Sequence, residues 1–355
     1  MRVLFLQDHL RMGATEKNTL ALARYGGERG QDTGLLVFRP GGVLTPDAPT
    51  PFYFRELQPF NSHIDEWAPG LGKAVRSFAP DAIIFMGKVA HLYLPLLRKE
   101  FPSVRHIATF RSSRSLFTYN FKAFKQADAI FCNSHFARKW LVRVQKHSLE
   151  KIEVIHNGCL LTPPQTPTGR HKGSHLRFLC VAMFRPSKNQ RELLFILSSL
   201  PQRIPWKCTF LGAGKTLKAC RRLAREMDLD DRVLFRKNVP PESLYPEHDL
   251  ALLTSSGKES LPNFLVEAQC FGLPAIAYLV NGVGECFAEG KSGFGIPLGD
   301  RSAFQSALIR LADNPDLQTK MGENARLFGK SHFDFSEKSA EFFSKLEEVE
   351  GSGSC

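Results

Sequence analysis

The sequence predicts an α/β protein built from two doubly wound domains, each with a parallel sheet flanked by helices. The chain has 355 residues, which is more than one ordinary core usually holds. Strand-like apolar runs alternate with helix-like stretches along almost all of it. The alternation is interrupted by "LLTPPQTPTGRHKGSH" (160–175), which is rich in Pro, Thr and Gly and has no period. This break separates two domains.

Six strand candidates precede the break and six follow it. The first set is "RVLFL" (2–6), "GLLVF" (34–38), "DAIIFMG" (81–87), "RHIATF" (105–110), "DAIFCNS" (128–134) and "IEVIHNG" (152–158). The second set is "RFLCVAMF" (177–184), "CTFLGAG" (208–214), "RVLFRKNV" (232–239), "DLALLTS" (249–255), "PAIAY" (274–278) and "GFGIP" (293–297). Open parallel sheets bind ligands beyond the carboxyl ends of their strands, so we expect the site in a cleft where the two domains face each other.

The pattern sets the following boundaries. We expect an N-terminal domain over 1–162, a linker over 163–175 and a C-terminal domain over 176–332. Helical spacing in "SEKSAEFFSKLEEVE" (336–350) predicts a terminal helix within 333–350, and "GSGSC" (351–355) resembles an added tail.

Composition is that of an ordinary globular protein, with 43% hydrophobic and 23% charged residues. No apolar run approaches the roughly 20 residues of a membrane helix, and "MRVLFLQDHL" lacks the apolar stretch of a secretory signal. The eight cysteines form no C-x-x-C pair that would suggest zinc. We therefore expect a cytoplasmic protein with reduced thiols.

The positive charge is concentrated in one segment. The chain carries a net charge of +12, and residues 98–151 alone contain 12 Lys and Arg against 3 Asp and Glu, together with many aromatic residues. Three interpretations are open: a solvated face over core aromatics, a surface for anionic lipid, or a nucleic-acid surface. No nucleic-acid recognition motif accompanies the segment, which argues against the third.

The stretch "ESLPNFLVE" (259–267) places two glutamates eight positions apart around a turn. Pro262 disfavours helix at the residue before it and Asn263 is a good N-cap, so a helix is predicted over 264–271. Free N–H groups at its start form an anion site suited to phosphate. Glu267 and Glu259 would then reach hydroxyls on either side, as in a nucleotide sugar. The alternative is that Glu267 only favours the helix N-terminus and Glu259 is a solvated loop residue.

This stretch resembles the E-x7-E motif of retaining glycosyltransferases with the two-domain GT-B fold, in particular glycosyltransferase family 4. The resemblance covers most of the chain in the same order. It includes "LRMGATEKNTLALA" (10–23), "IEVIHNG" (152–158), "AMFRPSKNQRELL" (182–194), "FLGAGKTLKACRRLAREMDLDDRVLF" (210–235) and "NGVGECFAEGKSGFGIPLGD" (281–300). The family implies a GT-B fold, two Rossmann-like domains facing each other across a cleft.

The resemblance implies a role for the two glutamates of "ESLPNFLVE" and for the two cations of "AMFRPSKNQRELL". Glu267 would bind the donor ribose and Glu259 would face the transferred sugar. Arg185 and Lys188 would hold the diphosphate and stabilise its charge as the glycosidic bond breaks. Many relatives have arginine where this chain has Met183, which leaves the geometry of this clamp open. A solvated pair is the other interpretation of Arg185 and Lys188.

Further positions carry over by the same resemblance. Leu261, Pro262, Asn263 and Leu265 would contact the donor mainly through backbone, and Gly212 would form a tight turn beside it. Gly13 would let the backbone approach the donor and the acceptor.

Two acceptor positions depart from the pattern. Ala14 stands where relatives usually have a second glycine. Arg111 stands where many relatives have a histidine, and an arginine cannot act as a base at neutral pH. Its expected role is to bind a phosphate or an acidic acceptor. Neither His106 nor His135 is assigned a catalytic role.

The implied function is transfer of a sugar, with retention and without a metal, from a nucleotide-diphosphate sugar to a hydroxyl of a cell-envelope glycan. The resemblance favours a UDP-sugar as donor and a lipopolysaccharide, capsule or other lipid-linked acceptor. It also favours a peripheral contact between the basic 98–151 segment and the inner face of an anionic membrane, and no nucleic acid. The alternatives are a non-catalytic protein of the same fold that binds nucleotide sugars or glycans, and a basic adaptor.

Overall fold

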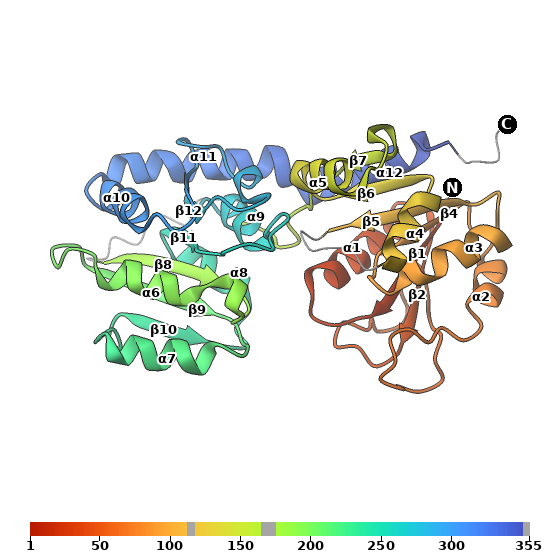
Figure 1. Ribbon diagram of the computed structural model, residues 1–355, viewed down its shortest axis with the longest axis horizontal. Coiled ribbons are helices and arrows are strands. Elements are labelled where there is room, and N and C mark those ends of the chain that lie inside the picture. The colour runs from red at the N-terminus through yellow and green to blue at the C-terminus, as the bar shows by residue number, and fades with distance from the viewer. Residues whose placement is uncertain (112–117, 165–174, 351–355) are drawn as a thin grey trace. The chain divides into compact units, whose positions relative to one another are not determined.

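The computed structural model describes residues 1–111, 118–164 and 175–350. The chain divides into two compact units (Figure 1). The N-terminal unit comprises Met1–Asn157 and the chain from Phe335 onward, and the C-terminal unit comprises Gly158–Asp334. The expected linker falls largely in 165–174 and the expected tail in 351–355, both outside the described residues.

The N-terminal unit is a seven-stranded sheet in the order β3-β2-β1-β4-β5-β6-β7, with every pairing parallel. Its strands are β1 (Arg2–His9), β2 (Asp32–Arg39), β3 (Tyr53–Glu56), β4 (Ala82–Phe85), β5 (Arg105–Phe110), β6 (Ala129–Cys132) and β7 (Ile152–Val154). Its helices are α1 (Ala14–Glu28), α2 (Leu71–Phe78), the 3-10 turn η1 (Ala90–Tyr93), α3 (Leu94–Glu100), α4 (Thr118–Gln126), α5 (His135–Gln145), η2 (Leu149–Lys151) and α12 (Phe335–Glu348).

The sheet is buried on both faces because its strands alternate between two apolar layers. On β1, Leu4 and Leu6 pack in the layer formed with α2 and α3, whereas Val3 and Phe5 pack in the layer formed with α1 and α12. In the second layer Phe342 of α12 stacks on Phe5. The terminal helix is therefore part of the N-terminal unit.

The C-terminal unit is a six-stranded parallel sheet in the order β10-β9-β8-β11-β12-β13. Its strands are β8 (Leu176–Val181), β9 (Trp206–Leu211), β10 (Val233–Arg236), β11 (Leu250–Leu253), β12 (Ala275–Tyr278) and β13 (Gly293–Ile296). Its helices are η3 (Pro186–Lys188), α6 (Gln190–Ser198), α7 (Leu217–Glu226), α8 (Pro241–Leu244), η4 (Tyr245–Glu247), α9 (Asn263–Cys270), η5 (Val283–Glu285), α10 (Arg301–Ala312) and α11 (Pro315–Phe333). Two apolar layers cover this sheet as well.

The doubly wound α/β prediction is confirmed in both units, and each of the twelve expected strands overlaps an observed one. β3 was not expected from the sequence. This short strand pairs only with β2, and its residues Tyr-Phe-Arg-Glu alternate between exposed and half-buried, so no apolar run marks it.

Three further expectations can be compared with the structure. The seven described cysteines are buried and form no disulfide. Within the ranges that the structure covers, no helix is long and apolar enough to cross a bilayer. The N-cap prediction was wrong by one residue, because Pro262 occupies the N-cap position of α9 and Asn263 is its first helical residue.

Candidate functional site

The start of α9 lies at the carboxyl edge of the C-terminal sheet. The chain leaves β11 at Leu253 and reaches α9 through the loop that carries Glu259. Leu261, Pro262 and Leu265 are buried, which fixes the loop and the first turn of the helix. Pro262, the N-cap residue of α9, has no side-chain acceptor for the N–H groups of the first turn. The helix start therefore keeps the geometry of an anion site.

Two of the predicted donor residues contact each other directly. The Lys188 ammonium lies 2.5 Å from Oε1 of Glu259, and the Ser255 hydroxyl donates to the same oxygen at 2.6 Å. Glu259 is 5% exposed, so it is not the solvated loop residue of the alternative interpretation. A charged pair and a hydroxyl thus hold the Glu259 carboxylate at the end of β11.

Glu267 is held from a different direction. The Tyr245 hydroxyl donates to Oε2 of Glu267 at 2.5 Å, and Tyr245 is itself fully buried. Burial, followed by the neighbouring carboxylate, raises the pKa of Tyr245 well above its usual value, so the phenol stays protonated and remains a donor. Tyr245 lies in η4, 22 residues before Glu267, and no sequence motif pointed to it.

Arg185 lies three residues before Lys188, immediately before η3. Its side chain is exposed, and in the described part of the chain it makes no hydrogen bond or ion pair. Met183 is also exposed. Lys188 is therefore engaged with Glu259, whereas Arg185 is available to a ligand.

Gly212 and Gly214 form the turn after β9. Their φ angles are +148° and +147°, and a Cβ on either would collide with the backbone carbonyl of Ala182 or Phe184. Only glycine fits these positions, because both the backbone conformation and the close approach exclude a side chain. The turn brings the ends of β8 and β9 together at the carboxyl edge of the sheet.

The N-terminal unit contains a pocket of about 360 Å³ at the carboxyl ends of β1, β4 and β5. Arg111 lines it at the end of β5, and its Nη1 donates to Oδ1 of Asn18 on α1 at 2.5 Å. The other lining residues are Gln7, Asp8, Arg11, Thr15, Glu16, Met86, Gly87, Lys88, His91, Thr109, Phe110, Asn120 and Phe124.

Gly13 and Ala14 stand at the start of α1, beside this pocket but outside its lining. Gly13 is the N-cap residue, with an extended backbone. A Cβ there would collide with the carboxylate of Glu16, so the glycine leaves room for Glu16 over the helix start. This places a carboxylate at the pocket that the sequence analysis did not identify.

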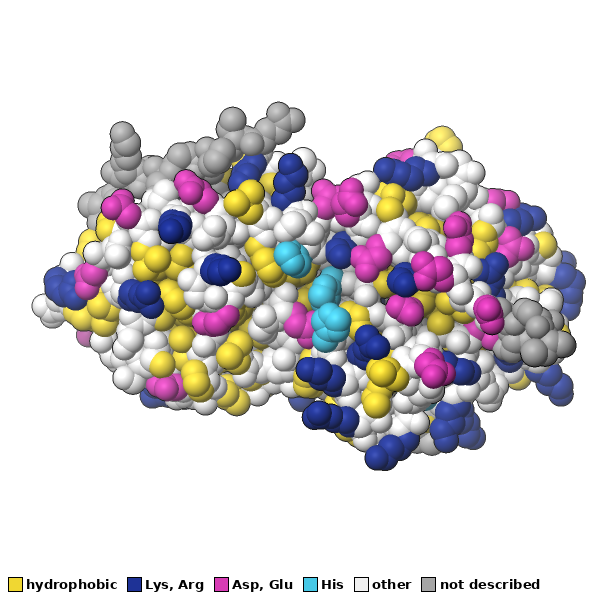
Figure 2. All heavy atoms as spheres, turned by 90° about the horizontal axis from the view of Figure 1, so that it is seen from above, with side chains coloured by type: hydrophobic (Ala, Val, Ile, Leu, Met, Phe, Trp, Pro, Cys, Tyr) yellow, Lys and Arg dark blue, Asp and Glu magenta, His cyan; other side chains and the backbone are white. Residues whose placement is uncertain are grey.

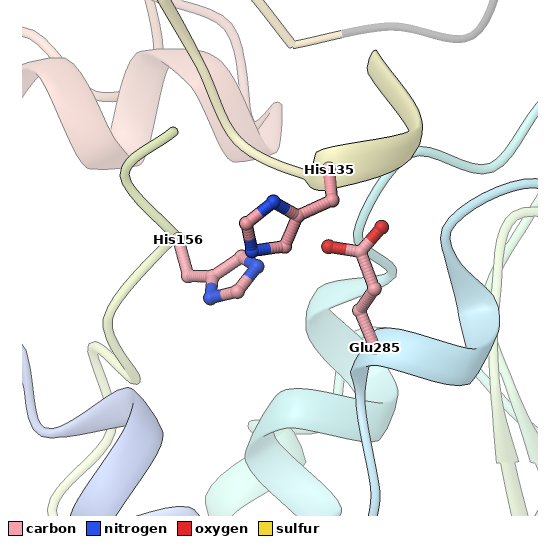
Figure 3. Close-up of side chains that lie close together, drawn as sticks. All are labelled: His135, His156 and Glu285. Carbon is pink, nitrogen blue, oxygen red and sulfur yellow. The ribbon is translucent and has the colours of Figure 1, made fainter. Parts of the chain in front are cut away.

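His106 and His135 lie in different environments. His106 is fully buried, its Nδ1 lies 2.7 Å from the carbonyl oxygen of Val104, and burial lowers its pKa to about 4. His135 is the first residue of α5, and its ring meets that of His156 edge to face at 5.6 Å between centroids (Figure 3). Neither lines the pocket.

Some basic side chains of the 98–151 segment form contacts within the N-terminal unit. Arg98 forms a bidentate ion pair with the buried Asp128, and Arg105 donates to the carbonyl oxygen of Leu346 at the end of α12. Other Lys and Arg side chains gather on one side of the N-terminal unit (Figure 2). On α5, Lys139 and Arg143 are exposed, next to the exposed Val144.

Two family models match this chain. Residues 15–160 match the family described as "Glycosyltransferase Family 4", and residues 167–328 match "Glycosyl transferases group 1". Together the two matches extend over most of both units.

Solved structures share the architecture of the whole chain. The complex of Anabaena HepE with UDP has a TM-score of 0.81 at 19% identity and covers 98% of this chain and 100% of that one. The apo form of the lipopolysaccharide outer core galactosyltransferase WaaB has a TM-score of 0.74 at 17% identity, with coverage of 98% and 100%. At these identities the likeness establishes the fold.

Sequence relatives match over shorter stretches. The N-acetyl-alpha-D-glucosaminyl L-malate synthase of Bacillus anthracis is 29% identical over 147 residues, which are 41% of this chain and 38% of that protein. The D-inositol 3-phosphate glycosyltransferase of Streptomyces scabiei is 33% identical over 227 residues, 58% of this chain and 51% of that protein. The chain thus spans about half or less of the length of these curated relatives.

Proposed function

The chain belongs to glycosyltransferase family 4 and has the GT-B fold, and from this premise we propose that it transfers a sugar from a UDP-sugar to a hydroxyl of a cell-envelope glycan. The C-terminal unit would bind the donor and the N-terminal unit the acceptor. The observation that carries the proposal is the arrangement of Glu259, Lys188 and Glu267 around the start of α9.

Each donor group has a partner of matching chemistry in this arrangement. The N-terminus of α9 and the exposed Arg185 suit the diphosphate, because both favour negative charge. Glu267, oriented by Tyr245, suits the ribose hydroxyls. Glu259, held by Lys188 and Ser255, suits the hydroxyls of the transferred sugar.

The proposed reaction proceeds with retention at the anomeric carbon and without a metal or other cofactor. The acceptor hydroxyl attacks on the face from which the nucleoside diphosphate departs, and the departing phosphate takes its proton. Arg185 and Lys188 stabilise the charge that develops on that phosphate. These two cations would supply part of the neutralisation that a divalent ion supplies in other phosphate sites.

The acceptor proposal rests on the pocket of the N-terminal unit. Its volume of about 360 Å³ and its polar lining suit part of a glycan. The structural similarity to WaaB, a lipopolysaccharide outer core galactosyltransferase, supports a lipid-linked acceptor. We further propose that exposed basic residues of the 98–151 segment, Lys139 and Arg143 among them, contact an anionic membrane.

A thermal-shift panel of UDP, GDP, ADP and CMP tests the donor site. A ligand that binds only the folded state stabilises it by about 2.7 kcal/mol at a hundredfold excess over Kd. We expect UDP to raise the melting temperature of the wild type and of Glu242→Ala, an exposed-residue control in the same unit, but not of Glu267→Ala. No rise with any nucleotide would contradict the proposal.

Turnover separates the enzyme from a binding protein of the same fold. With the UDP-sugar that gives the largest shift, release of UDP should fall by at least about a hundredfold in Glu259→Gln while the shift with UDP persists. Retention would be read from the anomeric configuration of the product, and activity should persist in a metal chelator. Nucleotide binding without any turnover would favour the non-catalytic alternative.

A further inference from the structure

The pocket of the N-terminal unit contains a partly buried positive charge without an acidic partner. Burial lowers the pKa of Arg111 to about 10, still well above neutrality, so the guanidinium remains charged. Its hydrogen bond goes to the neutral amide oxygen of Asn18. Within the described ranges, no Asp or Glu lies within 4.0 Å of this guanidinium. Because buried charges are normally paired, Arg111 is suited to receive an anion from a ligand.

The other basic side chains of the pocket differ from Arg111 in ion pairing, protonation or exposure. Arg11 forms an ion pair with Asp65, which already supplies it with a negative charge. His91 is buried, and burial lowers its pKa to about 4, so its imidazole is neutral near pH 7. Lys88 is an exposed residue. Arg111 is therefore the cation that a ligand's acidic group would meet away from bulk water.

Carboxylates line another part of the same pocket. Asp8 is 7% exposed, its Oδ1 accepts from Nε2 of Gln7 at 2.5 Å, and a Cβ on Gly87 would collide with it. Glu16 lies over the start of α1. Burial raises the pKa of both carboxyl groups; the charge of Asp65 raises that of Asp8 further, and the charge of Asp8 raises that of Glu16. Carboxylates accept hydrogen bonds from hydroxyls and repel anions.

We propose that this pocket selects an acceptor sugar with one acidic substituent, a phosphate or a carboxylate, which pairs with Arg111 while free hydroxyls face Asp8 and Glu16. The assignment of this ligand as the acceptor rests on the proposed function. The expected acidic substituent and hydroxyls of the ligand are inferred from the pocket residues. Gly87 is part of the site, because a side chain at this position would collide with the Asp8 carboxylate.

Calorimetric titration with glucose, glucuronate and glucose 6-phosphate, each in the presence of UDP, tests the selectivity. We expect at least one acidic sugar to bind about tenfold or more tightly than glucose, and the better of the two identifies the acidic group. Arg111→Gln should remove the preference for that sugar, and Asp8→Asn should weaken binding of all three. Arg76→Gln, which removes an exposed positive charge elsewhere in the same unit, should retain the preference.

A structural role for Arg111 gives a different result. Without ligand, Arg111→Gln should melt at or above the wild-type temperature, because it removes a desolvated charge. A lower melting temperature with unchanged selectivity would overturn the inference, as would equal affinity for the three sugars or binding of none. The shift with UDP and its loss in Glu267→Ala remain measurable in each case, so failure of this inference is distinguishable from failure of the proposed function.

Discussion

Lys188 and Glu259, the proposed catalytic residues, also form an ion pair that stabilises the fold. The carboxylate is almost fully buried and the ammonium partly so, which makes each the other's counter-ion in the absence of donor. Removing one member of a buried pair leaves an uncompensated charge, whereas removing both does not. Donor binding would therefore have to rearrange this pair or bind around it.

A double-mutant cycle tests that dual role. We expect Lys188→Met to lower the free energy of unfolding by about 3 kcal/mol, because Glu259 is left buried without a cation. The double variant Lys188→Met with Glu259→Gln should recover most of this loss while remaining inactive. Denaturant unfolding measures both values. Additive losses in the double variant would mean that the two side chains are not coupled in solution.

His91 makes the N-terminal unit sensitive to acid. Its folded pKa of about 4 lies below the value near 6.5 of an unfolded chain, so between these pH values the unfolded state binds more protons. Stability contributed by neutral His91 is thus present above pH 6.5 and is lost as the pH falls toward 4. The full loss is about 3 kcal/mol.

Unfolding curves from pH 7 to pH 4 measure this contribution. Both proteins should lose stability between pH 7 and pH 4. The loss in free energy of unfolding should be about 3 kcal/mol smaller for His91→Gln than for the wild type. His63→Asn, which changes an exposed histidine of the same unit, should follow the wild-type curve. If His91→Gln and the wild type lose equal stability, His91 is protonated in the folded state at a higher pH than its burial implies.

At the scale of elements, the turn after β9 depends on the absence of side chains. Gly214 and Gly257 have nearly equal φ angles of +147° and +144°, but a Cβ on Gly214 would strike the carbonyl of Phe184, whereas a Cβ on Gly257 would meet nothing within 4 Å. Both Gly→Ala changes carry the backbone penalty of about 1 kcal/mol, and Gly214→Ala adds a collision. Thermal unfolding should therefore show a clearly larger loss for Gly214→Ala. Equal losses would show that the turn relaxes freely.

The elements also show what the sequence could predict. Apolar runs located the strands of both sheets because parallel strands covered on two faces are nearly continuous in hydrophobic residues. β3 was missed because an edge strand with exposed Tyr53 and Arg55 lacks that run. The start of α9 was misplaced by one residue because Pro262 and Asn263 both suit a helix entry.

The sequence predicted those candidate site residues that belong to a local motif. It did not predict contacts between residues that are far apart in the sequence. The motif marked Glu259 and Glu267, but the partner Lys188 lies 71 positions before Glu259, and no periodicity joins them. Tyr245 and Asp8 were missed for the same reason. Their roles come from contacts that form only when separate strands end at one edge of a sheet.

The whole molecule has two hydrophobic cores, each on the two faces of its own sheet. The last helix belongs to the first core, since Phe343 packs with Tyr25 and Phe5. Phe304 is the matching buried phenylalanine of the other unit. Replacing either by alanine should destabilise its own core by about 3 to 5 kcal/mol.

These two variants should act on different thermal transitions. In calorimetry with and without UDP, we expect UDP to raise the transition that Phe304→Ala lowers, because the proposed donor residues lie in that unit. Phe343→Ala, although it lies near the end of the chain, should lower the other transition and leave the UDP-induced rise intact. A single transition lowered equally by both variants would show that the two cores unfold as one cooperative unit, in which case donor binding would stabilise the acceptor pocket as well.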